Sequence, residues 1–309
     1  MATLLGRDVL SARDLDKEEM ERIFEVAEEL LPVARKEKTS SLLEGKLMAA
    51  LFYEPSTRTR LSFETAMQRL GGRVVSAVGM EYSSLKKGET LYDTGKVVEN
   101  FADVVAMRHP SAGSVKELAD GANIPVLNAG DGAGEHPTQA LLDLFTMRKE
   151  RGSIDGLTIA MVGDLKFGRT VHSQCYLLAY YKVKLIFVSP SQLRMPDEVK
   201  NFLREKNIEF TETEKLEDAL AQAHVVYDTR VQQERFEDPA EYERFKHYYV
   251  LTRELIEKYN PDLTIMHPLP RIGELLPDVD GLKGAAYFRQ VQNGVAIRMA
   301  LLCLVLGKA

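Results

Sequence analysis

Residues 46–53 (KLMAALFY) and the residues that follow them, 54–64 (EPSTRTRLSFE), decide the fold class of the first half of the chain. The first run is apolar and has the length of a buried strand, and a helical pattern follows over 57–70. A buried strand that leads into a helix is the repeating unit of an α/β protein with a parallel sheet. Ligands of such sheets bind beyond the carboxyl ends of the strands, so the residues after each strand are candidates for a site.

The same alternation of strands and helices runs through the whole chain. Apolar spacings of three and four predict a helix over 15–35. The sequence then predicts strands at 74–78, 104–107 and 125–128, and helices at 90–101, 115–121 and 137–152. The pattern restarts with strands at 157–162, 184–188, 208–211, 225–228 and 263–266, and helices at 169–181, 196–206 and 290–306. We therefore expect an α/β fold of two doubly wound parallel-sheet domains.

The composition is that of an ordinary globular protein of about two domains. The 309 residues are 45% hydrophobic and 28% charged, which excludes a mostly disordered chain. The net charge of -6 argues against a protein that binds nucleic acid or anionic membranes. Two cysteines are too few for a disulfide scaffold or a cysteine-built metal site. The N-terminus does not resemble a signal peptide, and the longest apolar run, 299–306, is too short to span a membrane, so we expect a cytoplasmic protein.

The residues between the first strand and its helix suit an anion. A helix start offers unpaired N–H groups and the positive end of the helix dipole. Ser56, Thr57 and Thr59 add hydroxyl donors there, and Arg58 adds a planar group that matches phosphate. A serine or threonine cap with solvated arginines is the alternative, but so dense a run of donors favours a phosphate site.

A glycine-bearing turn also follows the strand at 157–162. Residues 163–170 (GDLKFGRT) are one residue away from a nucleotide-binding P-loop, with Arg169 where that motif requires lysine. Arginine does not replace the compact ammonium group of that lysine, so we expect no nucleotide here. The histidines have no metal-site spacing, and we expect no metal ion.

Residues 56–60 (STRTR) with 63–64 (FE) resemble the carbamoyl-phosphate signature of the transcarbamoylase family. Further segments, in the same order along the chain, look like the members of this family that use aspartate: 54–55 (EP), 86–90 (KKGET), 107–110 (MRHP), 128–132 (NAGDG), 136–139 (HPTQ), 163–166 (GDLK), 168–173 (GRTVHS), 229–232 (TRVQ), 267–271 (HPLPR) and 287–290 (YFRQ). The resemblance covers essentially the whole chain. It implies a carbamoyl-phosphate-binding domain, residues 1–135 with 291–309, and an aspartate-binding domain, residues 136–290.

The resemblance implies an enzyme that transfers the carbamoyl group of carbamoyl phosphate to the α-amine of L-aspartate, a step of pyrimidine biosynthesis. It implies no cofactor. The leaving phosphate can itself accept the proton of the amine, which explains why no side chain stands out as a general base. An ornithine carbamoyltransferase is one alternative, although such enzymes usually have a lysine at Glu54 and a cysteine loop at 267–270. A non-catalytic subunit of the same fold is the other, but it would have lost signature arginines that are present here.

For carbamoyl phosphate, the resemblance assigns four residues to the phosphate group: Ser56, Thr57, Arg58 and Thr59. Arg108 is implied to reach phosphate and carbonyl, His136 to polarise the carbonyl oxygen, and Gln139 to fix the carbamoyl amide. A neighbouring subunit is implied to add Ser83 and Lys87, which makes the expected assembly a homotrimer with shared active sites. The implied catalytic residues are Arg58, Thr59, Lys87, Arg108 and His136.

For aspartate, the resemblance implies two arginines and a glutamine of the second domain, together with Lys87 of the neighbouring subunit. Arg169 would hold one carboxylate, and Arg230 with Gln232 the other, which matches two arginines to a dicarboxylate. The alternative for Arg169 is an ion pair with Glu54 across the domain gap.

The loop 267–270 (HPLP) has two prolines, which make it stiff. The resemblance implies that Leu269 and Pro270 of this loop offer a backbone carbonyl environment to the amine of aspartate. Glu54 and Arg235 are implied to help join the two domains.

A regulatory chain as a partner is doubtful. Ala112 stands where chains that dock such a partner usually carry glutamate, and 134–135 (GE) resembles relatives that work without one. Phe167 is a further departure, because many relatives have a tyrosine there.

Overall fold

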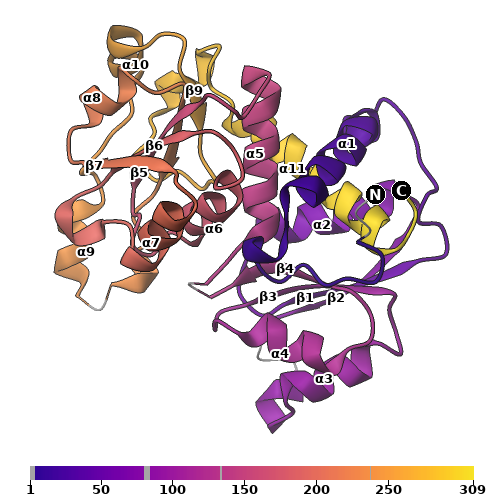
Figure 1. The fold of residues 1–309 in the computed structure, drawn as a ribbon. Coiled ribbons are helices and arrows are strands. Elements are labelled where there is room, and N and C mark those ends of the chain that lie inside the picture. The colour runs from indigo at the N-terminus through magenta and orange to yellow at the C-terminus, as the bar shows by residue number, and fades with distance from the viewer. Residues whose placement is uncertain (1–3, 80–83, 133, 237) are drawn as a thin grey trace. The chain divides into compact units, whose positions relative to one another are not determined.

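The computed structural model describes residues 4–79, 84–132, 134–236 and 238–309. The chain divides into two compact units, Met1–Leu142 with Val291–Ala309 and Asp143–Gln290. The division falls inside helix α5 (Pro137–Arg151), whereas the functional division expected from the sequence falls just before that helix, after residue 135. Helix α11 (Tyr287–Val305) returns the chain to the first unit, so this unit holds both ends of the chain (Figure 1).

The first unit is built on a four-stranded parallel sheet. Its strands are β1 (Leu47–Phe52), β2 (Arg73–Val78), β3 (Val104–His109) and β4 (Val126–Asp131), in the order β2-β1-β3-β4. Helices α3 (Leu91–Val98) and α4 (Ser114–Gly121) cover one face, and α1 (Lys17–Ala34), α2 (Thr57–Arg69) and α11 lie over the other (Figure 1). Strands β1, β3 and β4 are almost entirely buried, as expected for a parallel sheet with helices on both faces.

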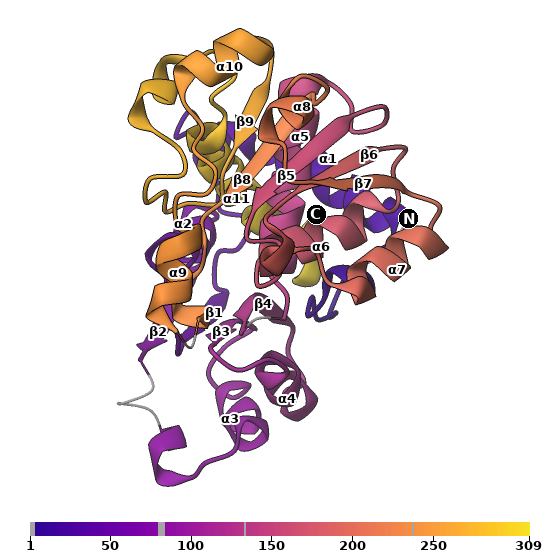
Figure 2. The same ribbon diagram turned by 90° about the vertical axis from the view of Figure 1, so that its left-hand side faces the viewer.

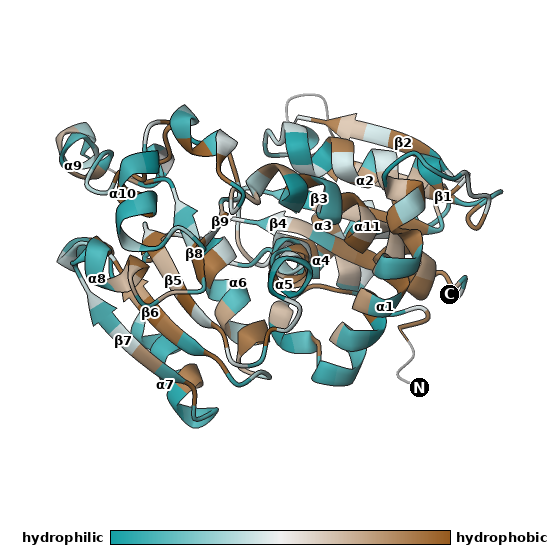
Figure 3. Cartoon of the chain, turned by 90° about the horizontal axis from the view of Figure 1, so that it is seen from above, coloured by the Kyte–Doolittle hydropathy of each residue, from teal (hydrophilic) through white to brown (hydrophobic). Residues whose placement is uncertain are grey.

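The second unit is built on a five-stranded parallel sheet in the order β7-β6-β5-β8-β9. Its strands are β5 (Thr158–Gly163), β6 (Lys184–Val188), β7 (Glu209–Thr213), β8 (Val225–Thr229) and β9 (Thr264–Met266). Helices α6 (Arg169–Leu178) and α7 (Asp197–Glu205) lie on one face, and α8 (Leu216–Leu220) and α10 (Arg253–Tyr259) on the other (Figure 2). Helix α9 (Pro239–Phe245) follows β8. Figure 3 shows β5 and β6 as mostly hydrophobic, which fits their burial at the centre of the unit.

The predicted fold class and the nine predicted strands are confirmed, with small shifts at their ends. Four helical predictions need correction. The helix predicted over 90–101 ends at Val98, and the one over 169–181 ends at Leu178. The one over 15–35 begins at Lys17, where Asp16 caps it, and the one over 290–306 begins at Tyr287. The sequence did not predict α8, α9 and α10, which have five to seven residues and so show too little periodicity. Within the described ranges, no helix is long and apolar enough to cross a membrane.

The strand order of each sheet reverses beside its first strand. In the first sheet β1 lies between β2 and β3, and in the second sheet β5 lies between β6 and β8. Successive connections leave such a strand toward opposite sides, which opens a crevice for ligands at the carboxyl ends of the two strands concerned. The topology therefore points to the ends of β1 and β3 in one unit and of β5 and β8 in the other.

Candidate active site

Arg108 and Glu54 lie together at the carboxyl edge of the first sheet, where the strand order reverses. Arg108 is the fifth residue of β3 and stands opposite Phe52 at the end of β1. Its Nη2 lies 2.7 Å from Oε2 of Glu54, the second residue after β1, and its Nη1 donates to the carbonyl of Ala129, 3.4 Å away. The guanidinium is thus held at the carboxyl edge of the sheet.

Helix α2 starts at the same edge. Ser56 is its N-cap residue and its hydroxyl makes no capping hydrogen bond to the helix, so the first-turn N–H groups are not satisfied by it. Thr57 and Arg58 are exposed, whereas Thr59 is buried. An exposed arginine beside an uncapped helix start gives the geometry that binds an anion.

A third segment of the first unit leads into α5. His136 is buried and directly precedes the helix, and Gln139 lies in its first turn, where its N–H donates to the carbonyl of His136. The carboxylate of Glu135 accepts from the hydroxyl of Ser11 and from the N–H of Ala12, which ties this segment to the N-terminal part of the chain.

A buried arginine joins the two helices that carry these residues. Arg298 of α11 is 3% exposed, and its Nη1 donates to the hydroxyl of Ser62 in α2, 2.8 Å away. Its Nη2 lies 3.4 Å from Oγ1 of Thr138 in α5, and its guanidinium lies 5.0 Å from the ring centre of Phe63. The sequence analysis did not identify this residue, although a lone arginine within the apolar run of the last helix is a visible signal.

In the second unit, Asp164 links the ends of β5 and β8. It is fully buried, and its carboxylate accepts from the N–H groups of Phe167 and Gln232, at 2.9 Å and 3.2 Å. Burial raises the pKa of Asp164, against these bonds and the nearby charge of Arg230, which lower it. The side-chain amide of Gln232 donates to the carbonyl of Phe167 at 2.8 Å, so the turn before Arg169 is fastened to the segment after β8.

The loop after β9 is fixed by a histidine. His267 accepts at Nδ1 from the N–H of Leu269, 2.8 Å away, and so its Nε2 is the nitrogen that donates to Glu274, also at 2.8 Å. Leu269 has a positive φ of 57° and is followed by a cis peptide bond to Pro270. The ring thereby sets the direction of the backbone at 268–270.

A buried hydrogen-bond network holds this loop from behind. The side-chain oxygen of Gln290 accepts from the N–H of His267 at 3.1 Å, and its amide nitrogen donates to Asp143 at 2.6 Å. Asp143 also accepts from Gln174 in α6 and from the hydroxyl of Tyr227 in β8, both at 2.8 Å. The carboxylate of Asp143 thus links α6, β8 and, through Gln290, the loop after β9.

Comparisons with known proteins match this arrangement over nearly its whole length. Residues 7–149 match the sequence model of the aspartate/ornithine carbamoyltransferase carbamoyl-P binding domain, and residues 155–305 match that of the Asp/Orn binding domain. The chain belongs to the aspartate/ornithine carbamoyltransferase family.

Several relatives have about 50% sequence identity to this chain, and each is named "aspartate carbamoyltransferase catalytic subunit". The protein from Methanosarcina mazei is 51% identical over 307 residues, 99% of both chains. That from Thermococcus kodakarensis is 50% identical over 302 residues, 98% of this chain and 97% of the relative.

Solved structures of the family show the same fold. The catalytic subunit of M. jannaschii aspartate transcarbamoylase is 47% identical, with a TM-score of 0.90 over 97% of this chain and 98% of that one. Aspartate transcarbamoylase from Trypanosoma cruzi, in complex with carbamoyl phosphate and aspartate, is 39% identical, with a TM-score of 0.92 over 98% of both chains.

The carbamoyltransferase residues expected from the sequence fall into two groups, one in each unit. The first unit holds Glu54, Ser56, Thr57, Arg58, Thr59, Arg108, His136 and Gln139. The second unit holds Arg169, Arg230, Gln232, Arg235, Leu269 and Pro270. Each group stands at the carboxyl edge of its own sheet or on a segment tied to that edge.

Four expected residues need separate mention. Lys87 is exposed at the end of a short 3-10 helix, Ser84–Lys87, in the first unit. Ser83 lies outside the described residues. The carboxylate of Glu54 pairs with Arg108 of its own unit, and the expected roles of Glu54 and Arg235 between the domains stay predictions.

Across the described ranges, no three His, Cys, Asp or Glu side chains are grouped so that they could hold a metal ion. The charged groups at the two sheet edges are instead arginines, with Asp164 and Glu54 fixing the segments around them. Such cationic groups suit anionic substrates.

Proposed function

We propose that this chain transfers the carbamoyl group of carbamoyl phosphate to the α-amine of L-aspartate, with one substrate bound by each unit. The products are N-carbamoyl-L-aspartate and phosphate, which makes the reaction a step of pyrimidine biosynthesis. The relatives at half identity are named for aspartate, and the chain has Glu54 and the loop 267–270 (HPLP) rather than the features expected of an ornithine enzyme.

The uncapped start of α2 is the observation that carries the assignment of carbamoyl phosphate to the first unit. Ser56, Thr57, Arg58 and Thr59 bring hydroxyl, amide and guanidinium donors to one helix start, and Arg108 stands at the neighbouring strand end. A phosphate dianion bound there places the carbamoyl carbonyl toward His136 and Gln139. His136 donates to the carbonyl oxygen and stabilises the negative charge that develops on it.

Aspartate is assigned to the second unit. Arg169 begins α6 and Arg230 follows β8, and the bonds of Asp164 and Gln232 hold their two segments together. The two guanidinium groups bind the two carboxylates of the substrate. The backbone of Leu269 and Pro270 accepts from the α-amine and directs its lone pair.

The chemistry needs no general base from the protein. The amine nitrogen attacks the carbonyl carbon, a C–N bond forms, and the bond between that carbon and the phosphate oxygen breaks. The leaving phosphate takes the proton that the amine loses, so charge and atoms balance without another reactant. The protein contributes orientation and stabilisation of the oxyanion.

The first test is an assay of purified protein with carbamoyl phosphate and either aspartate or ornithine, with release of phosphate and the carbamoylated product measured. We expect N-carbamoyl-aspartate and no citrulline. Carbamoylation of ornithine at a comparable rate would contradict the assignment, as would a lack of turnover with aspartate.

A homotrimer with shared sites is the proposed assembly. Leu61 of α2 and Val75 and Val78 of the edge strand β2 are exposed apolar side chains of the first unit, and they support a contact between copies. Lys87 would then act in the site of the neighbouring subunit, together with Ser83. A mass measurement by light scattering tests the trimer, and the shared site is tested by the subunit mixing described below.

The cytoplasm is the proposed location. Cys175 and Cys303 are both buried and both unbridged, which suits a reducing compartment. Fractionation of the source cells with an antibody against the chain is the direct test, and recovery from a secreted fraction would contradict it.

A further inference from the structure

Strand β8 carries a buried carboxyl group that the reaction above does not use. Asp228 is the fourth of the five residues of β8 and is 1% exposed. It stands opposite Val162 of the central strand β5, two residues before Arg230. A negative charge on a buried carboxyl group costs free energy unless a cation or hydrogen-bond donors lie beside it. The burial of Asp228 therefore needs a physical explanation.

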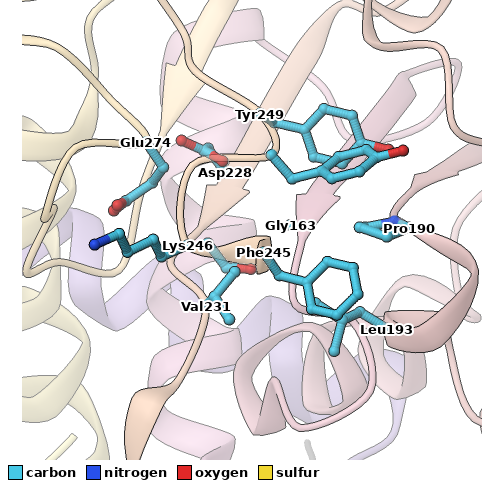
Figure 4. A pocket seen from close by; sticks show the side chains of 11 residues that line it. Gly163, Pro190, Leu193, Asp228, Val231, Phe245, Lys246, Tyr249 and Glu274 are labelled. Atoms are coloured by element: carbon cyan, nitrogen blue, oxygen red, sulfur yellow. The ribbon is translucent and has the colours of Figure 1, made fainter. Parts of the chain in front are cut away.

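Asp228 lines a small pocket inside the second unit, with a cavity volume of about 10 Å³. Four other ionisable side chains line it: Glu274, Lys246, Tyr248 and Tyr249. Figure 4 shows the carboxyl groups of Asp228 and Glu274 on the same side of the pocket, with the ring of Tyr249 on the other. Oδ2 of Asp228 is buried and has no hydrogen-bond partner in the part of the chain that the structure describes.

The surroundings of Glu274 make it the charged member of this pair. Its carboxylate accepts from Nε2 of His267 at 2.8 Å and from the N–H of Ile272 at 3.1 Å. Burial is the largest single effect and raises the pKa of Glu274, but the interactions with His267 and with the backbone N–H groups of Ile272 and Glu274 together outweigh it and hold the pKa below its usual range. Glu274 is therefore an acceptor whose negative charge is matched by donors.

The surroundings of Asp228 disfavour a second charge. The backbone N–H of Thr229 is the donor that faces its carboxyl group, and Lys246 is already in an ion pair with Glu243, 2.6 Å away. Burial, and then the charge of Glu274, raise the pKa of Asp228 well above its ordinary value. Two buried carboxylates in one pocket would repel each other strongly, and one of them keeps its proton instead.

We propose that Asp228 is a positioning residue for the aspartate-binding segments, and that it acts as a neutral carboxylic acid beside the charged Glu274. This inference rests on the proposed function, because it concerns how aspartate is bound. On one side of the pocket, β8, which leads into Arg230, contributes Asp228, and the loop in which Glu274 holds His267 and thereby Leu269 contributes Glu274. Loss of the proton from Asp228 forces these two segments apart and misplaces the groups that face aspartate.

The test of the positioning role is the pH dependence of aspartate binding in the full-length enzyme. Asp228→Asn keeps the shape of the protonated acid and stays neutral at every pH. We compare the KM for aspartate of wild type and Asp228→Asn from about pH 6.5 to about pH 9.5, because their ratio cancels the titration of the substrate and of all other groups. We expect the ratio of wild type to variant to rise by about threefold or more, while the same ratio for carbamoyl phosphate stays constant. A flat ratio for aspartate, or an equal rise for both substrates, overturns the positioning role.

The protonation state has its own readout. The infrared difference spectrum between wild type and Asp228→Asn at neutral pH should contain the carbonyl band of a protonated carboxylic acid. Asp143→Asn is the matched control, because Asp143 is equally buried but accepts from three side-chain donors, which favour its charged form. A carboxylate band in the Asp228 difference spectrum overturns the neutral acid and indicates a charge met by a bound cation. A wild-type enzyme that does not use aspartate would instead refute the proposed function. The infrared result would still report the protonation state of Asp228, because it does not depend on the substrate.

Discussion

Gly163 at the end of β5 and Thr229 at the end of β8 lie so close together that a Cβ atom on Gly163 would stand 2.1 Å from the carbonyl oxygen of Thr229. The hydroxyl of Thr229 donates to the carbonyl of Val162 at 3.1 Å, which also holds the ends of these two parallel strands together. Gly163 has a φ of 108°, a conformation that glycine adopts readily and other residues do not. This close approach fixes the ends of the two strands that lead into Asp164 and Arg230.

Gly163→Ala should therefore lower both stability and the use of aspartate. The backbone conformation alone costs about 1–3 kcal/mol for alanine, and the contact with Thr229 adds to it. Gly156→Ala is the matched control, because Gly156 has a φ of 88° in the same unit but no atom within 4 Å of the added Cβ. Thermal unfolding and the KM for aspartate should show a larger loss at Gly163. Equal losses in the two variants would mean that the close approach is unimportant.

The sequence predicted the sheets, and it indicated an anion site after the first strand, because both inferences depend on local pattern. Apolar runs of strand length alternate with helical periodicity, and the hydroxyls and arginine of 56–59 directly follow one of those runs. The order of the strands, which places Arg108 beside Glu54, is a matter of long-range packing and is not contained in any single segment.

The supporting residues were missed for the same reason. Asp143 and Arg298 lie inside helices, in stretches whose apolar pattern does not indicate what these two charged side chains bind. Their partners are up to 236 positions away in the sequence, as between Arg298 and Ser62. A buried charge in an apolar run is a signal that a partner exists, but it does not say which residue that partner is.

Removal of the Arg58 guanidinium should nearly abolish turnover and leave the fold intact. An exposed residue at a helix start contributes little to stability, whereas the loss of one preorganised donor to the transition state costs on the order of 10²–10³ in kcat. Arg60→Ala removes an equal charge from the same helix turn, where Arg60 lies 3.8 Å from Glu64, and should retain most activity. Circular dichroism checks the fold of both variants. Equal activity of the two would contradict the placing of phosphate at Arg58.

Arg298→Met should weaken the binding of carbamoyl phosphate more than that of aspartate. The substitution keeps an apolar stem over Phe63 but leaves the hydroxyls of Ser62 and Thr138 without the bonds that join α2 to α5. We expect a loss of about 1–3 kcal/mol in stability and a higher KM for carbamoyl phosphate. Ser62→Ala in the Arg298→Met background should then cost less than in wild type, because the two residues share one interaction. Additive losses would contradict the coupling.

The stability of Asp228→Asn should depend on pH in a direction that follows from the raised pKa of Asp228. An unfolded aspartate loses its proton near a pKa of about 3.9, whereas the folded protein keeps the proton until its higher pKa is reached. Between these two values the unfolded state binds fewer protons, so wild-type stability falls by about 1.4 kcal/mol per pH unit. The variant has no such group, so its stability relative to wild type should grow as the pH rises from about 4.

Urea unfolding at a series of pH values measures this difference. Asp143→Asn should instead be destabilised throughout, because an amide nitrogen then faces the donors of Gln174, Tyr227 and Gln290. A constant difference between Asp228→Asn and wild type across the acid range would mean that Asp228 is charged in the folded protein.

A mixture of two inactive variants should regain activity if active sites are shared between subunits. In a ring of three, Arg58→Ala and Lys87→Ala subunits form one site in each hybrid where Arg58 of one chain meets Lys87 of the next. Equal amounts mixed at random give about three-quarters hybrid rings, so about one quarter of all sites should be native. Lys86→Ala is the matched control for Lys87, because both lysines are exposed in the same 3-10 helix, and it should be active by itself. If native mass spectrometry shows that hybrids form and the mixture stays as inactive as its parents, Lys87 serves its own chain and the shared site is refuted.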